Sequence, residues 1–454
     1  MGRRGSRRAA VAVLAVLGAA CGSSGGDTED GAKPAAVVRD IGLDVGGASP
    51  VHPDGGLFPT TAADPTSGVV YASWAREVPG AVTADGDPRL EAVVARSDDG
   101  GETFGAPVVV SPPGTAVHTR SVSPTQVEVG PDGAVYVLFK HVEDLAGYSS
   151  PRRILHLVRS DDGGKTFSGP FGVGTEAVEG AVTSMDMADL FIAPDGDVFV
   201  SFLDSREKVA EALGRAAAGG AEPENQLRLA RSPDRGQTFA ASTLVSKPVC
   251  VCCGTKVAQG KGTPLFTTTR SEWYELKGSK DAVRDPFLSA SGDDGATWSK
   301  AQKIHDDKFK VSGCPDVNAG LAVDSAGRLH AAWYTGRDRG PGVYHAVSTD
   351  GGKTFSEPTA LMSGEWVPYA DVVMAMDGDA AWVAYEDRGG DVDQIEVARV
   401  GPDGAVTYSK PWPGHTPDLA VRGGAALVAF SGGAAGDDHE DVPGPVRLAT
   451  VTVR

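Results

Sequence analysis

Short apolar segments alternate with glycine-containing turns along most of the chain. The clearest unit runs from "TQVEVGPDGAVYVLF" (125–139) through "RILHLVRSDDGGKTF" (153–167) to "GPFGV" (169–173), which predicts four short antiparallel strands joined by tight turns. Only "SREKVAEALGRAAAGG" (205–220) has an apolar period typical of a helix. The 60 glycines and 30 prolines agree with a chain of many turns. The pattern therefore predicts an all-β protein.

An eight-residue motif, S-x-D-x-G-x-T-[F/W], follows the third predicted strand of several units. It occurs five times, starting at Ser97, Ser160, Ser232, Ser291 and Ser348. Its aspartate can accept backbone N–H bonds inside the loop, its glycine allows a positive φ, and its final aromatic residue can anchor the loop beneath the sheet. We therefore predict a structural role for Asp99, Asp162, Asp234, Asp293 and Asp350.

The units recur about every 60 residues, and four antiparallel strands per unit is the pattern of a β-propeller blade. A sixth unit begins at "DVVMAMDGDAAWVAYEDR" (371–388), and a seventh, beginning at "PDLAVRG" (417–423), has only three strands. The segment "AAVVRDIGLDV" (35–45) is predicted to supply the missing fourth strand and close the ring. Seven four-stranded blades are our prediction, with six as the alternative.

The motif and its spacing resemble the Asp-box (BNR) repeats of the sialidase-like β-propellers. "VCVCCGTKV" (249–257), "SGCPDVNAG" (312–320) and "AAWYTGRD" (331–338) are also similar to segments of bacterial exo-α-sialidase-like proteins that carry a C-x-C-C segment. The resemblance implies a single sialidase-like propeller over residues 36–454.

The N-terminal residues have the pattern of an export signal. Four arginines precede an apolar run from Ala9 to Ala20, which is too short to span a bilayer. "LGAAC", ending at Cys21, resembles a bacterial lipobox, so we predict a signal peptide over 1–20, lipidation of Cys21 and a flexible tether over 21–35. The expected location is extracytoplasmic, on the bacterial cell membrane through a lipid anchor. Secretion with cleavage elsewhere is the alternative.

The net charge argues against a nucleic-acid partner. The full chain has a formal charge of −18, and removal of residues 1–20 takes away four arginines and no acids, which gives −22. A surface this acidic repels phosphate backbones. The expected partners are a glycan, a metal or a protein at one face of the ring.

Propeller topology predicts which face carries the chemistry. The Asp-box turns lie on one side of the ring, while the crossings between blades and the loops between second and third strands lie on the other, around the channel mouth. The unusual residues fall in those crossings: His118, Met185, Met187, Cys250, Cys252, Cys253, Cys314 and Tyr369.

Three interpretations of the four later cysteines stay open. Two disulfides are the first, because an extracytoplasmic protein with four cysteines usually pairs them. A metal site is the second: Cys250 and Cys253 have C-x2-C spacing, Cys314 adds a third thiolate, and His118, Met185 and Met187 are accessory candidates for Cu(I) or Zn. A redox-active thiol pair is the third. Against the metal stands the expectation that the adjacent Cys252 and Cys253 point to opposite sides of an extended chain.

The resemblance also implies a possible sialidase reaction, with three arginines, a tyrosine nucleophile with a glutamate activator, and an aspartic acid. The F/Y-R-I-P motif that carries the first arginine is absent, because the corresponding "GGLFPTTAADP" (55–65) has no arginine. The remaining candidates are Tyr369, Glu386, Arg270 and Arg337. An arginine beside an acidic residue is more commonly a rim ion pair that organises a loop.

Three functions follow from these patterns. The main interpretation is a lipid-anchored propeller that binds a ligand or metal, with a cysteine cluster at the channel face. The alternative is an exo-α-sialidase-type glycoside hydrolase acting on sialic acid or related acidic glycans. The third is a structural scaffold in an envelope complex.

Overall fold

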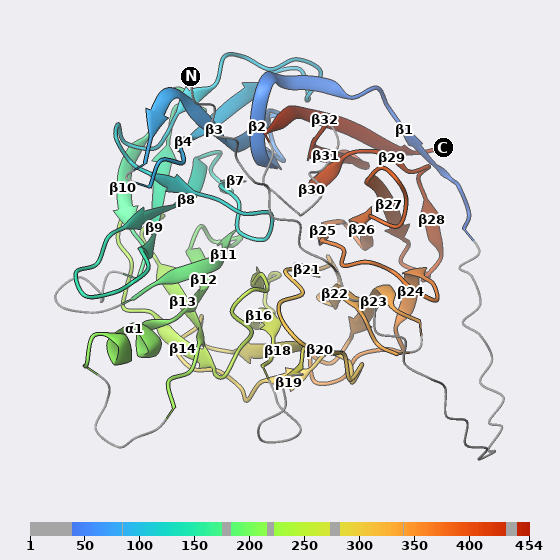
Figure 1. Cartoon of the computed structure of the whole chain (residues 1–454). Helices are drawn as coiled ribbons and strands as arrows, with labels where there is room; N and C mark the ends of the chain where they lie inside the picture. The colour runs from blue at the N-terminus through green and yellow to red at the C-terminus, as the bar shows by residue number, and fades with distance from the viewer. Residues whose placement is uncertain are drawn as a thin grey trace, which may run out of the picture.

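Antiparallel sheets arranged around a common centre make up the chain in a computed structural model (Figure 1). The structure describes residues 39–83, 85–174, 183–215, 222–272, 282–338, 340–432 and 443–454. The predicted all-β propeller class is confirmed. The predicted signal peptide, Cys21 and the tether lie outside the described residues. Within the described part of the chain, no helix has the length and apolarity that a bilayer crossing requires.

The repeating units of these sheets are called blades here, and the strands of each blade are given from the inside outward. Blades 1, 2 and 7 belong to one 13-stranded hydrogen-bonded sheet. Blade 1 contains β2 (Ser49–Ala63), β3 (Val70–Val82), β4 (Pro88–Ser97) and β5 (Val108–Val109). Blade 2 contains β7 (Gln126–Val129), β8 (Val135–Glu143), β9 (Arg152–Ser160) and β10 (Ser168–Gly172). Blade 3 contains β11 (Met185–Ile192), β12 (Val198–Asp204), β13 (Gln226–Ser232) and β14 (Thr243–Ser246). Blade 4 contains β15 (Lys256–Ala258), β16 (Leu265–Arg270), β18 (Pro286–Ser291) and β19 (Gln302–Lys303).

The remaining blades follow the same order. Blade 5 contains β21 (Ala319–Val323), β22 (Leu329–Thr335), β23 (Gly342–Ser348) and β24 (Thr359–Ser363). Blade 6 contains β25 (Val372–Asp377), β26 (Ala380–Asp387), β27 (Gln394–Val400) and β28 (Val406–Tyr408), and β29 (Trp412–Pro413) also pairs with β27. Blade 7 contains β30 (His415–Arg422), β31 (Ala425–Ser431), β32 (Gly444–Val453) and β1 (Leu43–Val45).

A few short elements lie between the blades. β6 (Val117–His118) pairs with both β4 and β8 and so joins blades 1 and 2. β17 (Ala282–Val283) pairs with β20 (Lys310–Val311). The segment predicted to be helical contains a single short helix in its described part, α1 (Arg206–Ala212).

The innermost strands contact one another in chain order, from β2 through β7, β11, β15, β21 and β25 to β30, and β30 contacts β2. The last blade is made from both ends of the described chain, because Leu43 pairs with Val453 and Val45 pairs with Val451. Figure 1 shows β1 and β32 side by side. β2 also pairs with β32, so the first and last strands are held in common sheets.

The core lies between the blades. Seven clusters of buried apolar side chains fill the spaces between successive blades in the described part of the chain. The second strand of a blade is covered on both faces, so β12 and β22 are buried at every position and are mostly apolar. The large side chains Trp74, Trp333 and Trp382 are fully buried on such strands.

The five Asp-box loops share one hydrogen-bond pattern. In the first, Asp99 accepts bonds from the Ser97 hydroxyl (2.7 Å) and the Thr103 backbone N–H (2.9 Å), and Ser97 Oγ accepts a bond from the Gly101 N–H (2.8 Å). The boxes of Asp162, Asp234, Asp293 and Asp350 repeat it. Bonds of this kind, the Thr297 hydroxyl bond foremost, lower the pKa of Asp293 to about 2. The box aromatics pack against the clusters between blades: Phe104, Phe167, Phe239, Trp298 and Phe355.

Candidate functional site

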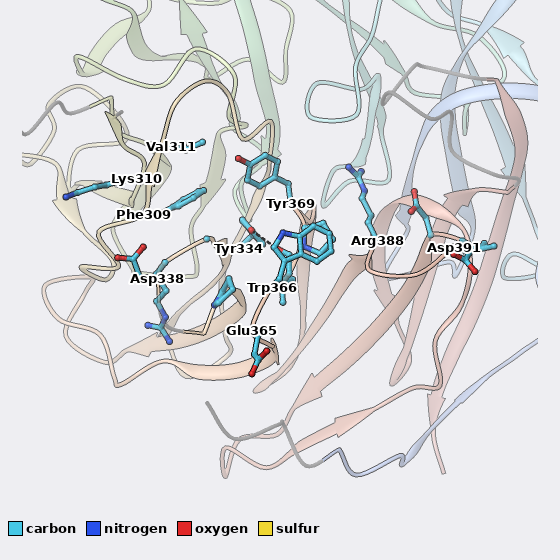
Figure 2. A pocket seen from close by; sticks show the side chains of 17 residues that line it. Phe309, Lys310, Val311, Tyr334, Asp338, Glu365, Trp366, Tyr369, Arg388 and Asp391 are labelled. Carbon is cyan, nitrogen blue, oxygen red and sulfur yellow. Dashed lines mark hydrogen bonds between the residues drawn. The ribbon is translucent and has the colours of Figure 1, made fainter. Parts of the chain in front are cut away.

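A cavity of about 870 Å³ opens between blades 5 and 6 and is called here the blade 5–6 cavity. It is bordered by β20, by the β22–β23 loop, by the crossing from β24 to β25 and by the β26–β27 loop. Figure 2 shows Tyr369 and Trp366 between the Phe309 side and the Arg388 side. These segments are the crossings and second-to-third-strand loops that the topology predicts for the chemically active face.

Aromatic side chains form the floor of the cavity. The rings of Phe309 and Tyr369 each pack against Tyr334, with centroids 6.0 Å and 5.7 Å from it and both contacts edge-to-face. The Tyr334 hydroxyl donates a hydrogen bond to the Val367 carbonyl at 2.8 Å, which fixes the ring and the crossing together. Trp366 differs from the others, because 72% of its surface is exposed. The cavity therefore has a rigid aromatic base and one exposed indole at its edge.

Charged side chains border the same space, and the arginines are held by neighbours. Arg337 lies 4.2 Å over the Tyr344 ring, and its Nη1 is 3.2 Å from Asp307. Arg388 forms an ion pair with the buried Glu386. The lining includes three cations and four carboxylates: Lys310, Arg337 and Arg388, and Asp338, Glu365, Asp391 and Asp393. This balance does not favour an anionic ligand.

The four residues predicted as a sialidase set do not form one site. Tyr369 and Arg337 line the blade 5–6 cavity. Arg270 is buried and donates hydrogen bonds to the carbonyls of Arg284 and Tyr334, so it is not directed at a ligand. Glu386 is buried against Arg388 and accepts the Thr416 N–H. Backbone carbonyls are the partners of Arg270, and a backbone N–H and Arg388 are the partners of Glu386, so the structure does not bring these two residues to the cavity with Tyr369 and Arg337.

Tyr369 also lacks the environment of an activated nucleophile. Burial and the neighbouring Cys252 raise its pKa. A tyrosine nucleophile needs the opposite influence, from an adjacent base or cation that favours its ionised form. The position of Tyr369 therefore fits an aromatic contact surface better than a covalent role.

Three cysteines meet beside this cavity and are called here the thiol cluster: Cys250, Cys252 and Cys253. Cys250 Sγ lies 3.2 Å from the Sγ atoms of both Cys252 and Cys253. In the described residues, these are the only three His, Cys, Asp or Glu ligand atoms that lie within 4.8 Å of one another. All three side chains are buried, in the hydrophobic cluster between blades 5 and 6. Thiol hydrogen bonds from Cys252 and Cys253 lower the pKa of Cys250, whereas the hydrogen bond with Cys250 raises the pKa of Cys252 and burial raises the pKa of Cys253.

The other predicted sulfur and imidazole ligands lie elsewhere. Cys314 is exposed and lines a separate cavity of about 310 Å³ together with Cys252; this space is called here the side cavity. His118 lies on β6, where burial and Lys140 lower its pKa to about 3. Met185 packs between blades 2 and 3, and Met187 packs between blades 3 and 4. Of the seven predicted sulfur and imidazole candidates, the structure therefore brings only the three cysteines together.

A buried ion pair borders the side cavity and was not found from the sequence. The Lys140 ammonium contacts Asp186 and also lies 3.0 Å from the Ser123 hydroxyl. Arg153 Nε lies 3.1 Å from the second Asp186 oxygen. Lys140 is buried, so Asp186 is the group that compensates its charge.

The central channel is narrow, about 60 Å³, and is lined by residues of the innermost strands. Lys256 Nζ lies 2.7 Å from Asp189, and Asp418 accepts the Thr61 N–H at 2.7 Å. Glu128 lines the same channel, and burial, followed by the charge of Asp189, raises its pKa to about 8. Glu128 is therefore expected to be protonated at neutral pH.

Replacing Glu128 by glutamine is expected to stabilise the protein increasingly as pH rises. Because the folded pKa of about 8 exceeds the ordinary glutamate pKa of 4.5, the stability of the natural protein declines as pH rises between these values and stays low above them. Glutamine removes that dependence, with a gain of about 1–3 kcal/mol at pH 9 and little change at pH 4. Thermal unfolding of both proteins between pH 4 and pH 9 measures this change in stability, and Glu357→Gln, at an exposed position, is the control. Equal changes in stability at pH 4 and pH 9 would contradict the raised pKa of Glu128.

No protein-family model matches this chain, and no curated protein matches it. Among solved structures, a Hadza microbial sialidase is similar at a TM-score of 0.50 and 16% identity, over 80% of this chain and 68% of that one. The GH93 α-L-arabinofuranosidase of Fusarium graminearum, solved with arabinobiose, is similar at a TM-score of 0.50 and 12% identity, over 90% of this chain and 98% of that one. A PL25 ulvan lyase is similar at a TM-score of 0.52 and 10% identity, over 90% of this chain and 95% of that one. At these identities the likeness concerns the fold, so the chain has the fold of the sialidase-like β-propellers.

Proposed function

We propose that this protein binds a glycan in the blade 5–6 cavity. The observation that carries the proposal is Trp366, an indole that is 72% exposed at the edge of a cavity of about 870 Å³ with a fixed aromatic floor. The apolar faces of sugar rings stack on exposed aromatic side chains, while neighbouring polar groups accept and donate hydrogen bonds to hydroxyls. Two of the structures that share the fold were solved with carbohydrate ligands, which supports the same class of ligand.

The charge of the lining favours a neutral saccharide over an acidic one. Its carboxylates outnumber its cations, and Arg388 is already paired with Glu386. A sialic acid carboxylate entering this space would meet excess negative charge without a free cluster of arginines. We therefore expect a neutral oligosaccharide to bind more tightly than a sialylated one of the same length.

Replacing Trp366 by alanine is expected to weaken glycan binding about tenfold, because the stacking contact contributes about 1–1.5 kcal/mol. Trp366→Phe keeps an aromatic face and is expected to retain most of the affinity. Isothermal titration with a panel of neutral and sialylated oligosaccharides measures both, with Val82→Ala on the exposed part of β3 as control. Unchanged affinity in Trp366→Ala, or no binding across the panel by the natural protein, overturns the proposal.

Glycoside hydrolysis is the second candidate function. It is favoured by the fold shared with a sialidase and an arabinofuranosidase and by carboxylates such as Glu365 and Asp391 in the cavity lining. Hydrolysis of a glycosidic bond uses a pair of carboxyl groups in most such enzymes. Release of a fluorogenic aglycone from a panel that includes sialosides and arabinofuranosides tests it, with Asp391→Asn and Glu365→Gln expected to abolish the release. A panel without turnover leaves glycan binding as the function.

We further propose that the chain is exported and anchored through Cys21, as the N-terminal pattern indicates. Incorporation of labelled palmitate into the natural chain, and its loss in Cys21→Ala, is the expected result. Labelling that persists in Cys21→Ala overturns the anchor.

A further inference from the structure

The thiol cluster is shaped by a turn rather than by an extended strand. Residues 251–253 form a turn between β14 and β15, so Cys252 and Cys253 both approach Cys250, while Val251 points to solvent and is 40% exposed. Sequence reasoning placed the two adjacent cysteines on opposite sides of the chain, and the turn removes that objection. The Cys250 N–H donates to the Arg270 carbonyl at 2.9 Å, which fixes the turn to blade 4.

Two buried guanidinium groups lie near enough to the three thiols for their charges to act on them. Arg270 is 2% exposed and Arg284 is 6% exposed, and the two are linked by the bond from Arg270 Nη1 to the Arg284 carbonyl at 2.7 Å. The Arg284 charge interacts with all three cysteines, and the Arg270 charge interacts with Cys253. This places positive charge beside a group of sulfurs that becomes anionic when it loses protons.

Several N–H groups of these arginines lack acceptors. In the described residues, Nε and Nη1 of Arg284 and Nε of Arg270 have no hydrogen-bond partner, although Arg284 Nη2 lies 3.4 Å from Glu272. A buried charged donor without an acceptor is costly to folding. Thiolates in the cluster would supply the missing negative charge, so the pocket is matched to an anionic sulfur group.

The donor set selects the class of cation. It contains three sulfurs, and in the described part of the chain no imidazole or carboxylate ligand atom joins them. Structural zinc is almost always four-coordinate, whereas soft thiolates suit Cu(I). Three thiolates and one monovalent cation leave two negative charges, which two guanidinium groups offset. Phe309, Tyr334 and Val317 surround the cluster and keep it dry.

We propose that Cys250, Cys252 and Cys253 bind one Cu(I) ion through three sulfurs, with Arg270 and Arg284 balancing its charge. Binding replaces the thiol protons still present, which leave to solvent, and no electron is transferred. Cys252 is 4% exposed and lines the side cavity, so the ion reaches the cluster from that side. Cys314 lies in the same cavity outside the cluster and is not a ligand of the bound ion. The site is independent of the glycan proposal.

Anaerobic titration of the reduced protein with Cu(I), in competition with bathocuproine disulfonate, tests the proposal. We expect one equivalent of copper in the natural protein and in Cys314→Ser, and a loss of affinity of about 100-fold or more in Cys250→Ser and Cys253→Ser. X-ray absorption of the loaded protein is expected to show three sulfur neighbours. Trp366→Ala keeps its copper, which separates this site from the glycan site.

Arg284 supplies a matched pair of variants. Arg284→Lys keeps the charge and is expected to retain copper affinity, whereas Arg284→Met is expected to weaken it about tenfold without changing the number of sulfur neighbours. Four results overturn the proposal: copper retained in Cys250→Ser, copper lost in Cys314→Ser, a natural protein that takes zinc but not copper, and a disulfide within the cluster of the unreduced protein that reductant does not open. Circular dichroism shows whether each variant is folded. If a serine variant does not fold, the copper titration and X-ray absorption of the natural protein decide the proposal.

Discussion

Replacing Asp186 by alanine is expected to lower the free energy of unfolding by about 3–5 kcal/mol, because it leaves a buried ammonium group without its counter-charge. Asp186 contacts Lys140, whose side chain is buried, and also lies 3.1 Å from Arg153 Nε. Burial alone would raise the pKa of Asp186, yet the charges of Lys140 and Arg153 lower it to about 2. Urea unfolding at pH 7 measures the loss.

The double replacement Lys140→Met with Asp186→Leu distinguishes an unpaired charge from lost packing. Removing both charges is expected to restore most of the stability, because a buried ion pair is often no more stable than apolar residues of similar size. Asp98→Ala is the control: its pair with Arg96 is exposed, and its removal is expected to cost less than about 1 kcal/mol. A double variant as unstable as Asp186→Ala contradicts the explanation.

The same pair predicts a pH dependence. The folded pKa of Asp186 is about 2, below the ordinary aspartate pKa of 3.8. Its ionised form therefore contributes stability that is complete above the unfolded pKa and is lost as pH falls toward 2. The natural protein is therefore expected to lose more stability between pH 5 and pH 2 than Asp186→Ala does. An equal loss of stability in the two proteins between pH 5 and pH 2 would contradict the lowered pKa of Asp186.

Replacing Leu43 by aspartate is expected to lower the free energy of unfolding by about 4 kcal/mol or more. Leu43 lies on β1, pairs with Val453 and is 1% exposed, in the cluster that joins blades 6 and 7. The substitution removes about 2 kcal/mol of apolar burial and adds the cost of a carboxylate in an apolar site. Thermal and urea unfolding measure the effect.

The neighbouring Asp44 provides the matched control on the same strand. Its side chain faces outward and forms an exposed pair with Arg454 at 2.6 Å. Asp44→Ala is expected to change stability by less than about 1 kcal/mol. If Leu43→Asp proves as stable as Asp44→Ala, then β1 does not contribute to closing the ring.

Much of the fold could be predicted from the sequence because its signals are local. Each Asp-box forms its own hydrogen bonds within eight residues, as Ser97, Asp99 and Thr103 illustrate, so the loop is recognisable wherever it occurs. The pairing of residues 43–45 with the last strand followed from a blade that had one strand too few.

The candidate site was less predictable, since its contacts join residues far apart in the chain. Glu386 was a candidate for the sialidase reaction, but the Thr416 N–H and Arg388 bind it. Arg284 was not among the candidate site residues, because its proximity to the three cysteines arises only from the fold. The convergence of Cys252 with Cys253 depended on a turn that the expected extended chain did not contain.

The pairing of β1 and β2 with β32 has a consequence for synthesis of the protein. β1 and one edge of β2 find their partner only when residues 444–453 have emerged, although β2 can already pair with β3. Until that moment, the chain forms an open arc with unpaired strand edges at its two ends. Exposed edges of this kind favour aggregation and attract chaperones. We expect nascent chains halted before β32 to be far more sensitive to protease than chains released after it.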